Sequence, residues 1–308
     1  MAKDLRSLPK LRDSLSFLYI EHAVIEQDAL SIIVIRKDER IPVPIAAMTV
    51  LLLGPGVSVT HAAIKAICDN GCTAIWCGEN ATRFYATGMG ETRSASNLLL
   101  QAKLCMDPDA HLTVVRRMYM RRFPDMDCAQ LSLKQIRGLE GIRVREAYRR
   151  LARQYGVAWK VRNYKQDDWD KADPINKAIS TANTVLYSLC QAAIVSLGYS
   201  AGLGFVHTGK LLSFVYDIAD LYKVDTTLPA AFSTIGGGYA DLDKDVRTAC
   251  RKTIKNERIL RRIPEDIAWI FDCDNISEQD MMETVGDIWG EGGDTIAGGV
   301  NYAGEAET

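Results

Sequence analysis

Two kinds of hydrophobic spacing divide the chain. From residue 15 to about residue 87, apolar residues fall in short runs rich in β-branched and aromatic side chains, which predicts β-strands. The predicted strands cover residues 15–20, 30–35, 48–53, 73–76 and 82–86. Turn-forming residues at 26–28, 37–39 and 54–56 separate them. One short helix, 61–69, interrupts the strands and ends before Asn70-Gly71.

After residue 95 the apolar residues recur at helical spacing instead. The predicted helices cover residues 95–106, 109–123, 132–155, 174–197, 213–223, 241–254 and 256–270. A stretch rich in Gly and Ser, 88–96, separates the two patterns and is the predicted linker. The sequence therefore predicts an α+β protein with a small N-terminal β-sheet or β-sandwich domain (1–90), a larger all-α domain (95–276) and a Gly-rich tail (277–308) that we expect to be flexible.

Composition and charge refine this picture. Hydrophobic residues make up 47% of the 308 residues and charged residues 25%, which is typical of a globular protein. The N-terminus lacks the apolar segment of a signal peptide, and the helix 174–197 is apolar nearly all round, as expected of a buried core helix. We therefore expect a cytoplasmic protein that is not embedded in a membrane. The eight cysteines show no C-x-x-C pair and are expected to be reduced.

Glu140 is the first candidate for chemistry. It lies within the apolar stripe of the helix 132–155, four residues after Ile136 and four before Val144. A carboxylate facing the core costs free energy unless a cation compensates it. Either Arg137 or Arg143, both three residues away, or a metal ion satisfies that requirement.

A second candidate group follows further along the chain. His207 lies between Gly204 and Gly209, and Asp217 and Asp220 are three residues apart on one helix. Taken singly, each residue has an ordinary structural explanation, as a loop residue or a solvated charge. Together with Glu140 they supply one nitrogen and three carboxylates, a set that suits Mg²⁺ or Mn²⁺ better than zinc. The segment 204–210 matches a phosphate-binding loop only in part, because Leu211 replaces the required Ser or Thr.

Basic residues are concentrated in the predicted helical domain. The tail 277–308 holds eight acidic residues and no Lys or Arg, so the rest of the chain carries 37 basic and 31 acidic side chains. Three clusters stand out, at 116–122, 134–165 and 247–262, and aromatic residues are interleaved in the second. Any one cluster fits a solvated helix face. Three in one domain favour contact with a nucleic-acid backbone, and Arg137, Arg143, Arg247 and Arg251 are candidate DNA contacts.

Several motifs of the chain resemble the spacer integrase family of CRISPR adaptation in its type I-E form. They are Gly54-Pro-Gly56 with Thr60-His-Ala-Ala63, the segment 135–145 around Glu140, Gln154-Tyr-Gly156, and the segments 204–210 and 214–220. The resemblance implies that Glu140, His207 and Asp220 bind a catalytic Mg²⁺ or Mn²⁺, with Asp217 as a neighbouring acidic residue. It also implies DNA contacts by Arg83, Tyr164, Tyr187, Lys210 and Tyr216.

The resemblance further implies a homodimer, joined through a dimer of a small ferredoxin-like adaptation protein into a heterohexamer. Its implied DNA substrates are a forked prespacer duplex and the leader and repeat of a CRISPR array. The chain departs from the family at His22, where type I-E relatives place a tyrosine that stacks on the DNA fork; Tyr19 is close in sequence but faces the other side of a regular strand. The chain also departs from the family pattern in its acidic, Gly-rich tail.

The implied reaction is attack of a 3′-hydroxyl on a phosphodiester of the repeat. Asp217 is expected to tune the metal site or to hold a metal-bound water. Two alternatives use the same residues differently. One is a nuclease acting on branched DNA in repair, and the other is a DNA-end-binding scaffold without catalysis.

Overall fold

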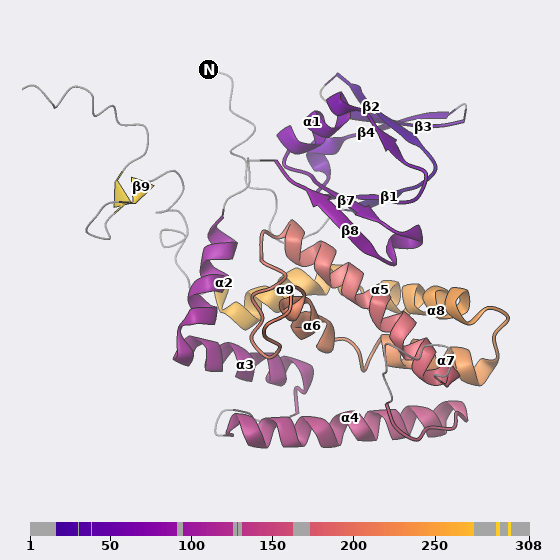
Figure 1. The fold of residues 1–308 in the computed structure, drawn as a ribbon, viewed down its shortest axis with the longest axis vertical. Helices are drawn as coiled ribbons and strands as arrows, with labels where there is room; N and C mark the ends of the chain where they lie inside the picture. The colour runs from indigo at the N-terminus through magenta and orange to yellow at the C-terminus, as the bar shows by residue number, and fades with distance from the viewer. Residues whose placement is uncertain are drawn as a thin grey trace, which may run out of the picture.

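The computed structural model describes residues 17–29, 31–37, 39–90, 95–125, 128, 131–162 and 173–273, together with two short strands at 288–289 and 295–296. The N-terminal part contains two four-stranded sheets and one helix (Figure 1). The helical part follows, and its helices pack around a separate, larger core. The fold is therefore α+β, as the sequence predicts.

The first sheet has the strand order β1-β5-β7-β8. Its strands are β1 (Phe17–Ile20), β5 (Val50–Leu53), β7 (Thr73–Cys77) and β8 (Phe84–Gly88). The first three strands run parallel, and β8 is antiparallel to β7. All four residues of β5 are buried, as expected of a parallel strand covered on both faces.

The second sheet has the order β4-β3-β2-β6. Its strands are β2 (Val24–Asp28), β3 (Ser31–Arg36), β4 (Glu39–Val43) and β6 (Ser58–Val59). Apolar residues of both sheets and of α1 (His61–Asp69) form one core, which includes Ile25, Leu51 and Ile67. Short 3₁₀ turns lie at Ile45–Ala47 and Glu79–Ala81.

Two expected turns are strands instead. Residues 26–28 belong to β2, and Glu39 begins β4. Their polar side chains obscure the strand pattern, but both strands pair antiparallel with β3, whose residues Ile32, Ile33 and Val34 are buried. β4 is an edge strand, which explains why it tolerates Pro42.

In the helical part, seven of the described helices correspond to the predicted ones: α2 (Ser96–Met106), α3 (Pro108–Arg122), α4 (Leu133–Tyr155), α5 (Pro174–Ser196), α6 (Ser213–Asp220), α8 (Leu242–Asn256) and α9 (Ile259–Phe271). An eighth, α7 (Thr227–Gly237), was not predicted. It is composed mostly of small and apolar residues and is buried on several sides, so it shows no alternation between a polar and an apolar face.

Helix α5 is the centre of the helical part. It is long and apolar enough to span a membrane by length and composition, but 56% of its most apolar window is buried inside the protein. It packs against α6, α7, α8 and α9, which is the environment of a core helix. Toward the first sheet, Ala192 of α5 belongs to one buried cluster with Val50, Leu52 and Ile75. Ser188 Oγ donates a hydrogen bond to the carbonyl of Thr82 at 3.1 Å. The β-rich and helical parts are thus joined by direct packing (Figure 1).

Helix α4 carries clear capping signals at both ends. Ser132 and Gln135 form a reciprocal capping box at its N-terminus, and Gly156 ends it in a left-handed conformation with φ of 65°. The expected linker residues 91–94 and the expected tail lie outside the described residues, except that β9 (Ile288–Trp289) and β10 (Thr295–Ile296) pair antiparallel.

Candidate active site

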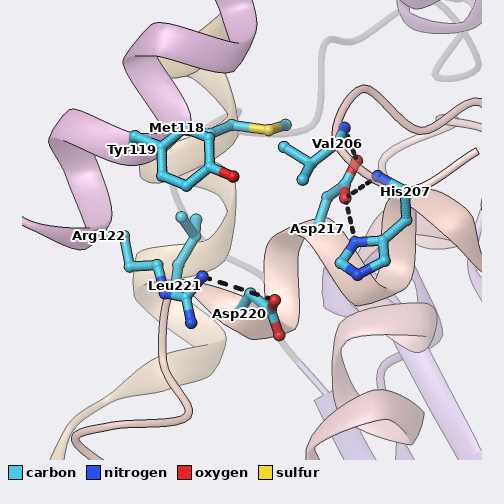
Figure 2. A pocket seen from close by; sticks show the side chains of 8 residues that line it. All are labelled: Met118, Tyr119, Arg122, Val206, His207, Asp217, Asp220 and Leu221. Atoms are coloured by element: carbon cyan, nitrogen blue, oxygen red, sulfur yellow. Dashed lines mark hydrogen bonds and ion pairs between the residues drawn. The ribbon is translucent and has the colours of Figure 1, made fainter. Parts of the chain in front are cut away.

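A pocket in the helical part lies between α3, α6 and the loop that precedes α6. It is lined by Met118, Tyr119, Arg122, Val206, His207, Asp217, Asp220 and Leu221. Figure 2 shows the polar side chains turned toward this space from three segments of the chain. Three of the four residues proposed from the sequence, His207, Asp217 and Asp220, therefore line one pocket.

Asp217 holds the loop that carries His207. Its side chain is buried, and its Oδ2 accepts hydrogen bonds from the backbone N–H of Phe205 at 2.6 Å and of Val206 at 3.1 Å. Its Oδ1 accepts one from the backbone N–H of His207 at 2.9 Å. Three backbone donors compensate the burial of the Asp217 charge.

The same carboxylate orients the His207 ring. Asp217 Oδ1 lies 2.7 Å from Nδ1 of His207 (Figure 2). A carboxylate only accepts, so Nδ1 carries the hydrogen, and Nε2 is the ring nitrogen with which His207 could bind a metal ion. The hydrogen bond that His207 donates to Asp217 raises the pKa of His207.

Close packing also fixes the loop before His207. A Cβ at Gly204 would overlap the backbone carbonyl oxygen of His207 and would lie 2.7 Å from the Cβ of Ser213. Gln101 of α2 is buried and bonds to this segment, donating to the carbonyls of Ser200 at 3.0 Å and Leu203 at 2.8 Å. No local pattern pointed to Gln101, because its partners lie about a hundred residues away along the chain.

Glu140 of α4 reaches the residues of α3. Tyr119 donates a hydrogen bond from its hydroxyl to Glu140 Oε2 at 3.0 Å, and Arg122 forms an ion pair with Oε1. Burial, together with the charge of Glu140, raises the pKa of Tyr119 to about 12, so the phenol keeps its hydrogen and donates it. The cation that compensates Glu140 is therefore Arg122, and not Arg137 or Arg143, the two candidates suggested by spacing along α4.

Asp220 lies near two cationic side chains, those of Arg122 and Lys223. Arg122 Nη1 lies 3.6 Å from its Oδ2, and Lys223 forms an ion pair with its Oδ1. Lys223 also lies 4.8 Å from the ring centroid of Tyr187. Burial by itself lowers the pKa of Lys223, but the negative charge of Asp220 and the contact with Tyr187 outweigh it and raise that pKa. The spacing of Lys223, three residues after Asp220, was a usable sequence signal for this pair.

The nitrogen and oxygen atoms in and beside the pocket suit a divalent metal ion. Nε2 of His207 and the carboxylates of Glu140 and Asp220 are one nitrogen and two hard oxygen donors, and the contact between Asp217 and His207 is the usual support of a metal-binding imidazole. Within the described part of the chain, no three His, Cys, Asp or Glu side chains are close enough as they stand to surround a metal ion. Instead, Arg122 lies between Glu140 and Asp220.

The basic cluster on α3 turns inward. Arg117 pairs with Asp272 and Arg121 with the buried Asp266. Arg116 donates a hydrogen bond to the carbonyl of Leu131 at 3.4 Å. With Arg122 in the pocket, each arginine of this cluster has a partner within the protein. The expected contact of the cluster with a nucleic-acid backbone stays a prediction.

The aromatic residues expected to contact DNA lie beside the pocket. The rings of Tyr187 and Tyr216 meet edge to face with centroids 5.0 Å apart, and the Tyr216 ring lies 5.8 Å from that of His207. Lys210 is exposed on the loop after His207. Tyr164 lies outside the described residues.

The expected basic DNA contacts are spread over several elements. Arg83 is exposed just before β8, and Arg137 is exposed on α4. Arg143 forms two contacts with Asp125, at 2.6 and 2.7 Å. Arg247 and Arg251 are half-buried on α8, where Arg251 donates to the carbonyl of Arg247.

Comparison with known proteins relates the chain to named relatives. Residues 119–248, which contain all four proposed site residues, match the family of CRISPR associated protein Cas1. The chain is 47% identical to CRISPR-associated endonuclease Cas1 2 of Thermus thermophilus over 309 aligned residues, covering 99% of this chain and 95% of that protein. It is 40% identical to CRISPR-associated endonuclease Cas1 of Escherichia coli, covering 82% of this chain and 83% of that protein.

A solved structure shows the same relationship. The crystal structure of a complex of TtCas1 with DNA covers 86% of this chain and 99% of its own, with a TM-score of 0.79 and 50% sequence identity. The sequence identity and the shared fold extend over both the β-rich and the helical parts. The chain belongs to the Cas1 family of CRISPR-associated endonucleases.

Proposed function

We propose that this protein is a metal-dependent DNA integrase and endonuclease of CRISPR adaptation, of the type I-E form, acting in the cytoplasm of a prokaryote. The observation that carries the proposal is the grouping of His207, Asp217 and Asp220 in one pocket, with Glu140 linked to it through Arg122. Membership of the Cas1 family, and the binding of DNA by the related TtCas1, support a DNA substrate.

In this proposal Glu140, His207 and Asp220 hold a Mg²⁺ or Mn²⁺ ion. When bound, the ion supplies Lewis-acid activation of a hydroxyl and neutralises charge that builds on the reacting phosphate. Asp217 keeps the hydrogen of His207 on Nδ1 and so presents Nε2 to the pocket. Of its two expected roles, the contacts favour tuning of the site over holding a water, because the backbone and His207 use both of its oxygens.

The residues around the pocket would bind the DNA. Lys210 is exposed for a phosphate contact, and Tyr187 and Tyr216 offer aromatic faces beside His207. The 3′-hydroxyl of a prespacer end attacks the repeat phosphodiester in line, forming one P–O bond as another breaks. Because the number of P–O bonds is conserved, the reaction is reversible on branched DNA, and water in place of the hydroxyl gives cleavage.

The proposed assembly contains two homodimers of this chain and one dimer of a small ferredoxin-like adaptation protein. This heterohexamer binds a forked prespacer duplex and the leader and repeat of a CRISPR array. The β-rich part is the proposed site of dimerisation and of contacts with the partner protein and with the DNA duplex. Arg83 is exposed in this part.

Glu140→Gln tests the proposed chemistry. This change keeps the size of the side chain and its ability to accept from Tyr119, but it removes the ligand charge. We expect loss of Mn²⁺-dependent cleavage and joining of branched DNA, with an unchanged circular dichroism spectrum and retained DNA binding. Asp245→Asn, a change from a carboxylate to an amide on α8 that does not touch the pocket lining, serves as the matched control.

Each alternative has its own outcome. Chemistry that survives Glu140→Gln in folded protein contradicts the proposed metal site. A wild-type protein that binds forked DNA but neither cleaves nor joins it with Mg²⁺ or Mn²⁺ is a scaffold. A protein that cleaves branched DNA equally with and without the adaptation partner, and never joins it, is a repair nuclease.

A further inference from the structure

Arg122 lies between two carboxylates that come from different helices. Its Nη1 nitrogen forms an ion pair with Glu140 Oε1 of α4, and the same nitrogen lies 3.6 Å from Asp220 Oδ2 of α6. The Arg122 side chain is only 10% exposed. Figure 2 shows Arg122 pointing across the pocket toward Asp220. One nitrogen atom thus holds together two of the three proposed metal ligands.

The two carboxylates need a cation at this position. The side chains of Glu140 and Asp220 are 23% and 19% exposed, so water screens them poorly. Two such carboxylates near one another repel unless a positive charge lies between them. Lys223 compensates Asp220 from one side, whereas the ion pair that the described structure gives Glu140 is with Arg122.

A divalent metal ion and the guanidinium would compete for the same oxygens. Mg²⁺ takes its oxygen ligands at about 2.0–2.1 Å, which leaves no room for a nitrogen between those oxygens. The guanidinium is not held by a complete set of hydrogen bonds, because its Nε atom is buried without a hydrogen-bond partner in the described structure. The guanidinium carbon also lies 5.2 Å from the centroid of the Phe123 ring, a contact that does not depend on the carboxylates.

We propose that Arg122 is an internal counter-cation of this site, a positioning residue that holds Glu140 and Asp220 together in the metal-free protein and that a bound divalent cation displaces. The inference rests on the proposed function, because it requires these two carboxylates to be metal ligands. It adds a consequence: the protein binds its metal more weakly than the same ligands would without Arg122, and in return the metal-free site stays folded.

Arg122→Met and Arg122→Gln test the inference in the full-length protein without DNA. Both remove the charge, and Met keeps an unbranched apolar side chain. We expect each to melt at a lower temperature than wild type in the presence of a chelator, because the two carboxylates then repel. We also expect each to bind Mn²⁺ about tenfold more tightly in a calorimetric titration, the scale on which groups around a metal site tune its affinity. Arg122→Lys keeps the charge and should stay close to wild type in affinity.

A double variant isolates the carboxylate repulsion. In chelator, Glu140→Gln combined with Arg122→Met should melt at a higher temperature than Arg122→Met alone, because one of the two repelling charges is gone. This comparison also applies if Arg122→Met is too unstable for a titration. The matched control is Arg117→Met on the same helix, whose partner Asp272 lies outside the pocket; it should lower the melting temperature and leave Mn²⁺ affinity unchanged.

The outcomes separate this inference from the proposed function. If wild type binds Mn²⁺ and neither neutral variant binds it more tightly, Arg122 is not displaced and the counter-cation role is wrong. If no variant and no wild-type protein binds Mn²⁺ or Mg²⁺, the proposed metal site itself is wrong, and the counter-cation role fails with it.

Discussion

Asp217 bonds both the backbone N–H and the ring Nδ1 of His207 through a single carboxylate oxygen, at 2.9 and 2.7 Å. The residue that shapes the loop is therefore also the residue that sets which ring nitrogen faces the pocket. Its other oxygen accepts from Phe205 and Val206, so loop conformation and ring orientation depend on one buried side chain. A change at Asp217 should affect folding and metal binding together.

Asp217→Asn is the direct test of this dependence. The amide keeps the shape of the side chain but directs an NH₂ group at groups that are themselves donors. We expect the free energy of unfolding in urea to fall by about 1–3 kcal/mol, and Mn²⁺ affinity to fall by roughly 10–100-fold. Asp245→Asn is the control, because Asp245 accepts from the backbone of Ala240 and Asp241 far from the pocket. If the Asp217→Asn variant binds Mn²⁺ as tightly as the wild type, Asp217 does not position His207 for metal binding.

Gly204→Ala should disturb the site through the backbone. The added Cβ would overlap the carbonyl of His207 and crowd Ser213 at the start of α6, so the loop has to move. We expect a loss of roughly 1–3 kcal/mol in the free energy of unfolding. Gly138→Ala in the interior of α4 is the matched control, because nothing lies within 4 Å of its Cβ position. It should stabilise the protein by up to about 1 kcal/mol; equal effects of the two changes would contradict this account.

Tyr119→Phe should separate the support of Glu140 from the stability of the core. Tyr119 is 3% exposed, and its hydroxyl donates to Glu140 Oε2 at 3.0 Å. Removing the hydroxyl leaves the ring in place, so we expect a stability loss of only about 0.5–1.5 kcal/mol. Mn²⁺-dependent cleavage should fall several-fold, because Glu140 loses a partner that orients it. Unchanged cleavage rates at saturating and at limiting Mn²⁺ would show that Tyr119 does not orient Glu140.

Asp266 should contribute to stability and not to the chemistry. It is fully buried on α9 and accepts hydrogen bonds from Tyr222 at 2.6 Å and from Arg121 of α3. Burial and the charge of Asp266 raise the pKa of Tyr222 well above its usual value, so its hydroxyl stays a donor. Asp266→Ala leaves the buried hydroxyl of Tyr222 without its acceptor, which should cost about 1–3 kcal/mol. It also breaks the ion pair with Arg121, whose side chain is 40% exposed, which should add at most about 1 kcal/mol. Tyr222→Phe should cost about 1–3 kcal/mol.

Urea denaturation measures the free energy of unfolding of Asp266→Ala and of Tyr222→Phe. A titration with Mn²⁺ should show that Tyr222→Phe leaves the metal affinity unchanged. The control is Arg261→Met, whose ion pair with Glu265 at 3.4 Å is exposed and contributes at most about 1 kcal/mol. If Arg261→Met and Asp266→Ala destabilise equally, burial does not explain the role of Asp266.

The sequence by itself determined the features that depend on local spacing. The change from a period of two to a helical period separates the strands from the helices, and seven of the described helices follow from it. Glu140 stood out because it falls within an apolar stripe, and the spacing of Asp217 and Asp220 placed both on α6. These properties follow from the residues within one or two turns of the chain.

Only the tertiary structure decided which residues meet. Local spacing offered Arg137 and Arg143 as partners of Glu140, but the packing of α3 beside α4 brings Arg122 to it from 18 residues away. In the same way, pairing with β3 makes strands of the polar segments at β2 and β4. The physical reason is that spacing along a helix or strand constrains contacts within that element, whereas contacts between elements depend on burial and pairing summed over the whole fold.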